Sequence, residues 1–263
     1  MAFYIGVDLE QSKNILSARS TVIAGRRASA IVRPMISVVI PTFNAEATLG
    51  PTLAALVPAV VDGVVQEAII VDGGSTDETA AIAEAAGTRL IQAQRGRGVQ
   101  LQAGAAAARG DWLLFLHADT VLDPGWAEEA EGFMERVATG RRAPAAAAFR
   151  FALDDDGLMP RLLEWLVALR CLLFALPYGD QGLLISRDLY RKLGGFQPLP
   201  LMEDVDLVRR LKRHQRVMLK SRAVTSGARY RNEGYVARSL RNLSCITLYY
   251  LRVPARVLAR LYG

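Results

Sequence analysis

The sequence predicts an α/β protein built on a single, Rossmann-like, mostly parallel sheet with helices on both faces. Two observations support this class. Between residues 36 and 116, short apolar segments rich in β-branched residues alternate with segments of helical spacing, which is the pattern of strands joined by crossover helices. Hydrophobic residues also make up 51% of the 263 residues, which excludes a disordered chain and allows a sizeable core.

The elements of this first half follow in a regular order. Strands are expected at 36–40, 67–71, 89–93 and 112–116, and helices at 46–57, after Ser75, and at 99–109. Ser75 and Glu78 have the spacing of an S-x-x-E capping box, so the second helix is expected to open there and to stop at Gly87. Ligands of such sheets bind at the carboxyl ends of the strands.

The alternation weakens after residue 119. Helices are expected at 126–138, 160–176 and 236–251, and strands at 145–151 and 182–186. The regular pattern begins abruptly at Ile36, directly after Met35. We therefore expect three parts: a poorly ordered N-terminal extension (1–34), one large domain (35–233) and a basic amphipathic helical segment (234–263).

We expect neither a membrane-spanning helix nor a signal peptide. Its best apolar run, 162–176, is interrupted by two charges and falls short of the ~18 residues that cross a bilayer. The N-terminus carries Asp8 and Glu10 where a signal peptide would be apolar. Two widely separated cysteines give no disulfide framework. We expect a cytoplasmic protein that can lie peripherally on the inner face of the membrane.

Positive charge is concentrated near the C-terminus. Residues 207–263 hold 14 Lys or Arg and one acid, a net +13, which leaves −7 for the preceding residues out of the total of +6. A basic tail behind an acidic body suits contact with phosphates or with an anionic membrane surface. Alternatively, these basic residues form an ordinary solvated face without a partner, and the sequence favours neither interpretation. No nucleic acid partner is expected.

Acidic residues stand where the predicted strands end. Asp72 ends the second strand, Asp119 follows the fourth, and Glu203, Asp204 and Asp206 cluster before a helix. A single Asp is commonly a turn or N-cap residue. Several carboxylates at one sheet edge, however, need a cation or a hydrogen-bonded ligand to offset the cost of crowding.

Four motifs then occur in a recognisable order, at 38–46, 70–77, 115–119 and 202–207. Together they resemble glycosyltransferase family 2, which has the GT-A fold. Within that family, the segments 96–98, 117–119 and 177–182 resemble a bacterial branch associated with radical-SAM and selenium-related domains. The resemblance covers residues 35–213 and implies an inverting transfer of a sugar from a nucleotide-diphosphate sugar, with a UDP-sugar favoured.

The resemblance assigns the donor site. Asp72 would hydrogen-bond the base, although Gly73 replaces the second Asp that is more common there. Arg95, Arg97 and Gly98 suit phosphate binding, because Arg pairs with phosphate bidentately and glycine permits close backbone approach; a solvated loop is the alternative. The complete set of expected donor-site residues is Pro41, Thr42, Asn44, Glu46, Asp72, Gly73, Arg95, Arg97, Gly98 and Ala118.

The divalent metal, Mn²⁺ or Mg²⁺, is expected on Asp119, the last residue of a motif that corresponds to D-x-D in the family. His117 stands in place of the first Asp. It can ligate Mn²⁺, which accepts imidazole better than Mg²⁺ does, or hydrogen-bond a phosphate or ribose. Alternatively, it only packs and orients Asp119.

Asp204 aligns with the family's catalytic base, which takes the proton of the acceptor hydroxyl. The neighbouring charge of Glu203 is expected to raise the basicity of Asp204. Acids at this position also suit a helix N-terminus. Asp180, Gln181, Arg229 and Arg231 are expected to contact the sugar, the acceptor or the diphosphate.

The acceptor is not identified by these motifs. Helices 160–176 and 236–251 carry Trp165, Tyr249 and Tyr250 among arginines, which suits either a membrane interface or ordinary core packing. The interface interpretation implies a lipid or lipid-linked acceptor. Two other functions are alternatives: a nucleotidyltransferase and a non-catalytic nucleotide-sugar binder at the membrane surface. The loop after the first strand lacks the glycine-rich phosphate motif that the former needs.

Overall fold

The computed structural model describes residues 34–174 and 176–262. The predicted N-terminal extension lies outside these residues except for Pro34, so that prediction stays untested. Pro34–Gly263 form one compact unit, and the predicted division at 233/234 falls inside it.

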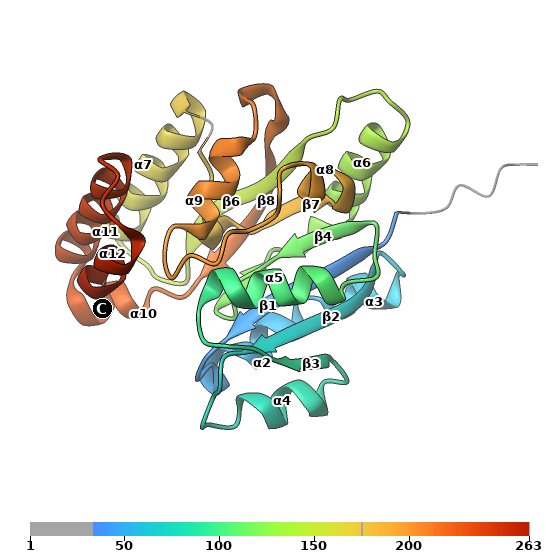
Figure 1. Ribbon diagram of the computed structural model, residues 1–263, viewed down its shortest axis with the longest axis horizontal. Helices are drawn as coiled ribbons and strands as arrows, with labels where there is room; N and C mark the ends of the chain where they lie inside the picture. Colours follow the sequence, from blue (N-terminus) through green and yellow to red (C-terminus); the bar gives the residue numbers. More distant parts are fainter. Residues whose placement is uncertain (1–33, 175, 263) are drawn as a thin grey trace, which may run out of the picture. The chain divides into compact units, whose positions relative to one another are not determined.

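An eight-stranded sheet forms the centre of this unit (Figure 1). Its strand order is β3-β2-β1-β4-β7-β6-β8-β5, and four of the seven pairings in the described chain are parallel. Strand β7 runs antiparallel to both its neighbours, and β5 runs antiparallel to β8. The α/β fold class is thus confirmed, with the non-parallel strands confined to one half of the sheet. The strands are β1 (Ile36–Thr42), β2 (Val65–Asp72), β3 (Arg89–Gln92), β4 (Trp112–Phe115), β5 (Thr120–Leu122), β6 (Ala146–Leu153), β7 (Leu183–Ser186) and β8 (Arg216–Thr225).

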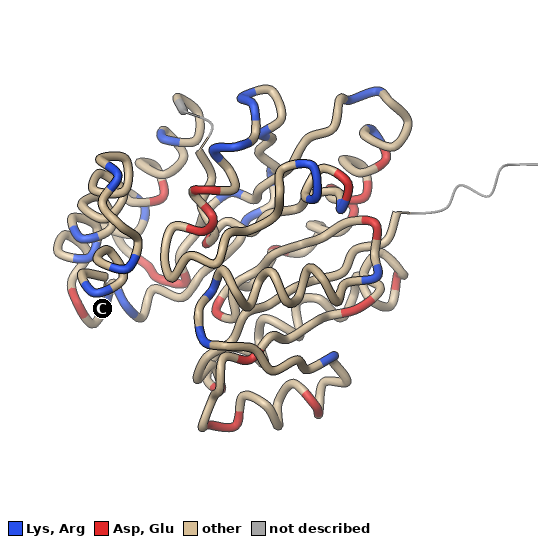
Figure 2. Tube along the Cα trace, in the orientation of Figure 1, with Lys and Arg blue, Asp and Glu red and all other residues tan. Residues whose placement is uncertain are grey.

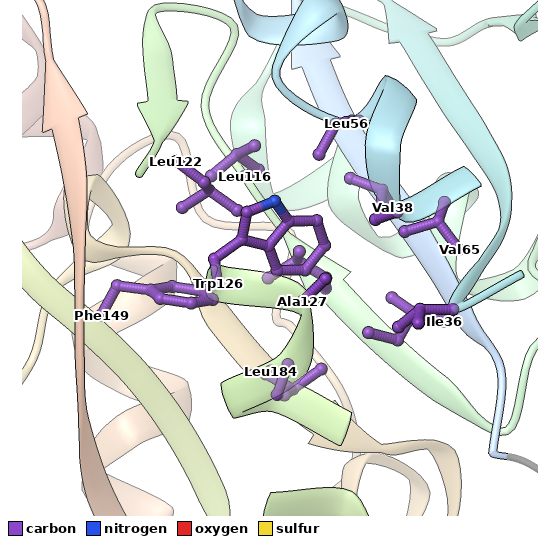
Figure 3. Close-up of a cluster of buried hydrophobic side chains, with 14 of the residues drawn as sticks. Ile36, Val38, Leu56, Val65, Leu116, Leu122, Trp126, Ala127, Phe149 and Leu184 are labelled. Carbon is purple, nitrogen blue, oxygen red and sulfur yellow. The ribbon is translucent and has the colours of Figure 1, made fainter. Parts of the chain in front are cut away.

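Helices cover both faces of the sheet, as the apolar strands require. One core cluster joins the sheet to α2, α3, α4 and α6, and Trp126 of α6 packs there among Leu116, Leu122 and Phe149 (Figure 3). A second cluster joins the other face to α5, α8 and α9. The helices are α2 (Glu46–Ala54), α3 (Val57–Val61), α4 (Thr79–Ala85), α5 (Arg97–Ala107), α6 (Trp126–Ala138), α7 (Leu158–Phe174), α8 (Arg187–Lys192), α9 (Glu203–Arg210), α10 (Ala228–Glu233), α11 (Tyr235–Tyr250) and α12 (Ala255–Tyr262).

The predicted capping box at Ser75 is wrong. Helix α4 begins four residues later, at Thr79. The Ser75 hydroxyl donates instead to Asp72 Oδ1 at 2.5 Å, and Asp77 Oδ1 accepts from the Thr79 N–H at 3.1 Å. Ser75 therefore serves the strand-end acid rather than the helix.

Two further differences have local causes. The predicted helix 46–57 is divided into α2 and α3, since Pro58 lacks the N–H that would continue the first helix. Strands β5 and β8 were not predicted. In β8 the basic side chains Arg216, Lys220 and Arg222 interrupt the apolar pattern, although Ala223 is fully buried.

The C-terminal helices complete the unit beside α9. Cys245 of α11 and Leu258 of α12 share a buried cluster with Met202 and Val205 at the start of α9. The predicted basic segment therefore packs against the element that carries the acidic cluster.

Candidate active site

The strand ends bring the predicted site residues to one edge of the sheet. Strands β2, β4 and β8 run in one direction, and β5 and β7 run in the other. Consequently the end of β4, the starts of β5 and β7 and the end of β8 share an edge. This edge carries His117, Asp119, Asp180 and Thr225.

A cavity of about 400 Å³ lies over this edge. Six of the predicted site residues line it, and they come from five separate parts of the chain. They are Arg97, His117, Asp119, Asp180, Asp204 and Arg229. The acids Asp119 and Asp204, 85 residues apart in sequence, thus face the same space.

Asp204 is held in the first turn of α9. Its Oδ2 accepts from the Gly179 N–H at 2.5 Å, and its Oδ1 accepts from the Val205 N–H at 2.7 Å. A Cβ atom added to Gly179 would lie 2.9 Å from Asp204 Oδ2 and also 2.9 Å from His117 Nε2. Both side chains therefore close on the same backbone position, where only glycine fits without displacement.

Glu203 does not line the cavity, and its side chain holds Arg97. The Glu203 side chain is 1% exposed, and its Oε1 lies 2.9 Å from Arg97 Nε. Burial raises the pKa of Glu203 to about 7, although Arg97 opposes this rise. Burial also works against the charge of Arg97, but the carboxylates of Glu203 and Asp204 outweigh it and raise the guanidinium pKa. Glu203 thus positions a permanent cation at the cavity wall.

His117 is a neutral imidazole near pH 7. Burial and the Arg97 charge lower its pKa to about 4, although Asp119 and Asp204 act in the opposite direction. A neutral ring offers a nitrogen lone pair to a cation or a hydrogen bond to a phosphate.

Asp180 carries an unused acceptor. Its buried Oδ1 has no hydrogen-bond partner among the described residues. Burial raises its pKa to about 6, assisted by Asp204 and Asp119 and opposed by Arg170. A buried oxygen without a partner is costly, so this atom is suited to a ligand that enters the cavity.

The cavity can share a cation with a ligand but does not enclose one by itself. Among the described residues, no three His, Cys, Asp or Glu side chains are grouped to hold a metal. Asp119 Oδ1 makes only a 3.4 Å contact with Thr225 Oγ1, which leaves lone pairs available. Divalent cations of this class are commonly bound by one or two carboxylates plus substrate phosphates. The residues present fit that arrangement.

Asp72 lies outside the cavity, at the end of β2. It is 1% exposed and accepts hydrogen bonds from Thr42 Oγ1 at 3.1 Å, Gly74 N at 3.1 Å and Ser75 N at 2.9 Å. Burial opposes its ionisation, but the bonds from Ser75, Gly74 and Thr42 outweigh burial and lower its pKa. Asp72 therefore organises the turn that follows β2.

Other predicted donor residues tie two loops together beside this turn. Asn44, at φ 49°, accepts from the Thr76 N–H through Oδ1 at 3.0 Å, and Glu46 Oε2 accepts from the Glu78 N–H at 3.1 Å. Pro41 lies within β1, and the Gly73 N–H donates to the Thr42 carbonyl at 2.9 Å. The loops after β1 and β2 thus form one surface next to the cavity edge.

Three further donor predictions have different surroundings. Arg95 stacks on the ring of Phe43, with 3.8 Å from Cζ to the centroid, and both side chains are exposed. A Cβ on Gly98 would collide with the backbone at Gln197 and Leu199, so Gly98 serves packing rather than phosphate approach. The Ala118 carbonyl accepts from Thr52 Oγ1 at 3.0 Å.

Two residues that are predicted to contact a ligand are instead bonded to other groups of the protein. Gln181 is 1% exposed; its Nε2 donates to the Phe149 carbonyl at 3.0 Å, and its Oε1 accepts from Arg170 and the Tyr178 N–H. Arg231 lies 3.2 Å from Asp154 Oδ1 and does not line the cavity. This geometry does not support either residue as a ligand contact, whereas Arg229 lines the cavity.

The apolar wall of the cavity is not among the site residues predicted from the sequence. Apolar side chains of α7 and α11 form it together with Tyr230 and Tyr262. Arg238 also lines it, 3% exposed and paired with Glu233 Oε1 at 3.0 Å. The only available signal was the presence of arginines within the apolar helical segments.

Comparison with known proteins agrees with this geometry. Residues 37–164 match the family described as Glycosyl transferase family 2. A glucosyl-3-phosphoglycerate synthase of Mycolicibacterium paratuberculosis is 38% identical over 95 residues, covering 33% of this chain and 29% of the relative. A PGL/p-HBAD biosynthesis glycosyltransferase of Mycobacterium bovis is 39% identical over 102 residues, covering 34% and 37%. The matched part thus spans about a third of each relative.

A solved structure extends the likeness beyond the matched segment. Glucosyl-3-phosphoglycerate synthase of Mycobacterium tuberculosis, in complex with Mn²⁺, UDP and glucosyl-3-phosphoglycerate, superposes with a TM-score of 0.53 at 27% identity. The alignment covers 76% of this chain and 74% of that one. The same enzyme has also been solved with Mn²⁺, UDP-glucose and phosphoglyceric acid, at a TM-score of 0.53.

Proposed function

The chain carries a glycosyltransferase family 2 domain with the GT-A fold, and on that premise we propose that it transfers a sugar from a UDP-sugar to an acceptor hydroxyl with inversion. UDP-glucose is the preferred donor, since structures of the related synthase contain it or UDP. One observation carries the proposal: Asp119, Asp180 and Asp204 line a single cavity at the edge where the strands end.

The donor is proposed to lie across the two neighbouring surfaces. The loops after β1 and β2, ordered by Asp72, receive the uridine, and the diphosphate extends toward the cavity. Arg97, at the start of α5, and Arg229, in α10, both line the cavity. Arg229 forms no ion pair with any described residue. Two guanidinium groups stabilise the charge that develops on the leaving phosphate.

Asp119 and His117 are the residues that would hold a divalent cation. A bound Mn²⁺ or Mg²⁺ would supply further charge stabilisation to the departing diphosphate. The neutral imidazole of His117 favours Mn²⁺ of the two.

Asp204 is proposed as the general base. The Gly179 N–H stabilises the charged carboxylate and fixes its direction, and each carboxylate oxygen keeps a second lone pair for the acceptor hydroxyl. The proton moves to this carboxylate as the hydroxyl oxygen attacks the anomeric carbon and the bond to the diphosphate breaks. Glu203 acts through Arg97 rather than on the acceptor.

We propose an acceptor with an apolar part, such as a lipid or lipid-linked molecule. The apolar residues that line the cavity together with the acids include Phe151, Leu163, Val167 and Ile246. A small anion such as phosphoglyceric acid, present in a structure of the related synthase, would leave these residues without contacts. A lipid acceptor would bring the protein into peripheral contact with the inner face of a membrane. The resemblance to the bacterial branch associated with radical-SAM and selenium-related domains stays a prediction.

Metal-dependent donor binding tests the proposed function directly. Calorimetry of UDP with the wild-type protein is expected to show binding that strengthens at least about tenfold with Mn²⁺. Asp119→Ala should lose this metal dependence, while Asp62→Ala, at an exposed position directly after α3, should keep it. Absence of UDP binding by the wild type, or unchanged metal dependence in Asp119→Ala, would contradict the assignment. Release of pyrophosphate instead of UDP during turnover would indicate a nucleotidyltransferase.

A further inference from the structure

The exposed apolar side chains are concentrated on three helices. Of the 18 large hydrophobic side chains that are exposed in the described chain, 14 lie on α7, α11 and α12 or on Leu251 between the last two. Scattered exposed apolar residues are normal in soluble proteins, whereas a large contiguous group marks an interaction surface.

On α7 these side chains form a stripe along the helix. Leu158, Leu162, Trp165 and Leu172 stand at positions i, i+4, i+7 and i+14 and are 88, 50, 59 and 75% exposed. Such spacing places them on one face of a helix. The opposite face, with Val167 and Cys171, packs on β6.

Helix α11 repeats the arrangement. Val236, Leu240, Leu243 and Tyr250 have the same spacing and are all exposed. Cys245, on another face, is buried against Leu258 of α12. Each helix therefore has one apolar face in the core and a second apolar face that no described residue covers.

The two stripes adjoin the active-site cavity. Residues of α7 and α11 line that cavity together, and the helices lie side by side with α12 (Figure 1). Leu166 and Leu243 both line the cavity and are about half exposed. The apolar cavity wall thus continues onto the exposed apolar surface.

Positive charge borders this surface. Residues 235–262 contain five arginines and no acid, and the blue segments on α11 and α12 mark them in Figure 2. Arg252, Arg256 and Arg260 are exposed and form no ion pair with any described residue. Arg256 and Arg260 alternate with the exposed Val257 and Leu261 along α12. Two copies of such a surface would repel each other, whereas an anionic lipid surface complements both its charge and its apolar stripes.

We propose that the exposed faces of α7, α11 and α12 form a docking surface for a bilayer that contains anionic lipids. Among the described residues, none of the helices has the length and hydropathy of a membrane span. In the proposed arrangement the three helices lie in the plane of the bilayer, with their apolar stripes in the interface. If the proposed transferase function holds, on which this last step rests, the acceptor enters the cavity from the bilayer between Leu166 and Leu243.

Vesicle binding tests the docking surface independently of catalysis. The full chain is cosedimented with phosphatidylcholine vesicles and with vesicles that also contain 25% phosphatidylglycerol. We expect at least about tenfold stronger partitioning to the anionic vesicles. The triple variant Leu162→Ser, Trp165→Ser, Leu240→Ser should lose most of this binding, because all three side chains are exposed and lie outside the cavity lining.

Two matched variants separate the contributions. Arg256→Gln with Arg260→Gln should reduce the preference for anionic vesicles while keeping weak apolar binding. Val60→Ser with Val61→Ser, which removes two exposed apolar side chains from α3, should bind like the wild type. Thermal unfolding and UDP calorimetry of every variant establish that the fold and the donor site are intact.

Three results would overturn the docking proposal. These are wild-type protein that stays in the supernatant with both vesicles, equal binding by the triple variant, or a concentration-dependent dimer that the triple variant abolishes. Any of them leaves the transferase assignment untouched as long as UDP still binds, whereas loss of UDP binding in the wild type contradicts the transferase alone.

Discussion

The Oδ2 atom of Asp204 accepts a hydrogen bond from the backbone N–H of Gly179 at 2.5 Å. This bond joins the first turn of α9 to the turn that precedes β7, and the two residues are 25 positions apart in sequence. It also brings Asp204 beside His117, because a side chain at residue 179 would contact both. The proposed base is therefore oriented by a backbone donor, which cannot rotate away as a side chain can.

Gly179→Ala should lower kcat by displacing the side chains of the active site. The added methyl group would lie 2.9 Å from both Asp204 Oδ2 and His117 Nε2, so these side chains must move. Because small displacements of catalytic groups are costly, we expect a loss of kcat on the order of tenfold to a hundredfold in UDP release from UDP-glucose. Gly50→Ala is the control, since nothing lies within 4 Å of its added Cβ. Wild-type kcat in Gly179→Ala would show that this backbone contact does not orient the site.

Asp72→Asn should destabilise the fold in a pH-dependent way. The carboxylate accepts from Thr42, Gly74 and Ser75, and its replacement leaves buried donors poorly paired, at a cost of roughly 1–3 kcal/mol at pH 7. Hydrogen bonds lower the pKa of Asp72 below its ordinary 3.8 despite burial. Its stabilisation is thus present above pH 3.8 and is lost as pH falls through the folded-state pKa.

Urea unfolding at pH 7 and at pH 3 measures this effect. The deficit of Asp72→Asn relative to the wild type should shrink at the lower pH. Asp62→Asn, at an exposed position, should match the wild type at both. A deficit that stays constant or grows on acidification would mean that the Asp72 carboxylate is not stabilised in its charged form.

Glu203→Gln should show the opposite pH trend. Burial raises the pKa of Glu203 to about 7 from its ordinary 4.5, although Arg97 opposes the shift. Between these values the folded state binds the additional proton, so the contribution of Glu203 is complete below pH 4.5 and is lost as pH rises through 7. Relative to the wild type, Glu203→Gln should therefore gain unfolding free energy between pH 4.5 and 8, on the order of 3 kcal/mol.

The same urea titration at pH 4.5 and 8 checks this trend, with exposed Glu84→Gln as the control. A variant that instead becomes relatively less stable at pH 8 would show that the ion pair with Arg97 outweighs burial. Because Glu203 anchors Arg97 at 2.9 Å, we also expect weaker UDP binding in this variant.

Local sequence patterns predicted the elements that are apolar or clearly amphipathic. The four parallel strands and helix α6 follow from such patterns, and α6 spans the predicted residues 126–138. Strand β8 was not predicted because basic side chains interrupt it and only three of its ten residues, Leu219, Ala223 and Thr225, are buried. The capping box failed because Ser75 has a competing acceptor in Asp72, and sequence spacing does not show which partner is nearer.

The site was predictable where it depends on strand ends. Asp119 is predicted at the site because it follows a parallel strand, whereas Asp204 is predicted there from the family resemblance; both line the cavity. Gln181 and Asp180 are adjacent polar residues, yet only the tertiary contacts show that Gln181 is bonded to backbone groups and to Arg170. An oxygen of Asp180, in contrast, has no partner among the described residues. The cavity wall from α7 and α11 depends on helix packing, which a helical period alone does not fix.

The most direct test of the central claim compares turnover and donor binding in Asp204→Asn. UDP release from UDP-glucose is measured in the presence of Mn²⁺, with 3-phosphoglycerate and with a polyprenol as acceptor probes, each of which offers a hydroxyl. UDP affinity is measured by calorimetry. We predict that kcat falls by ~10²-fold or more while the UDP dissociation constant changes less than about threefold. Wild-type turnover with weakened UDP binding would contradict the role of Asp204 as the base.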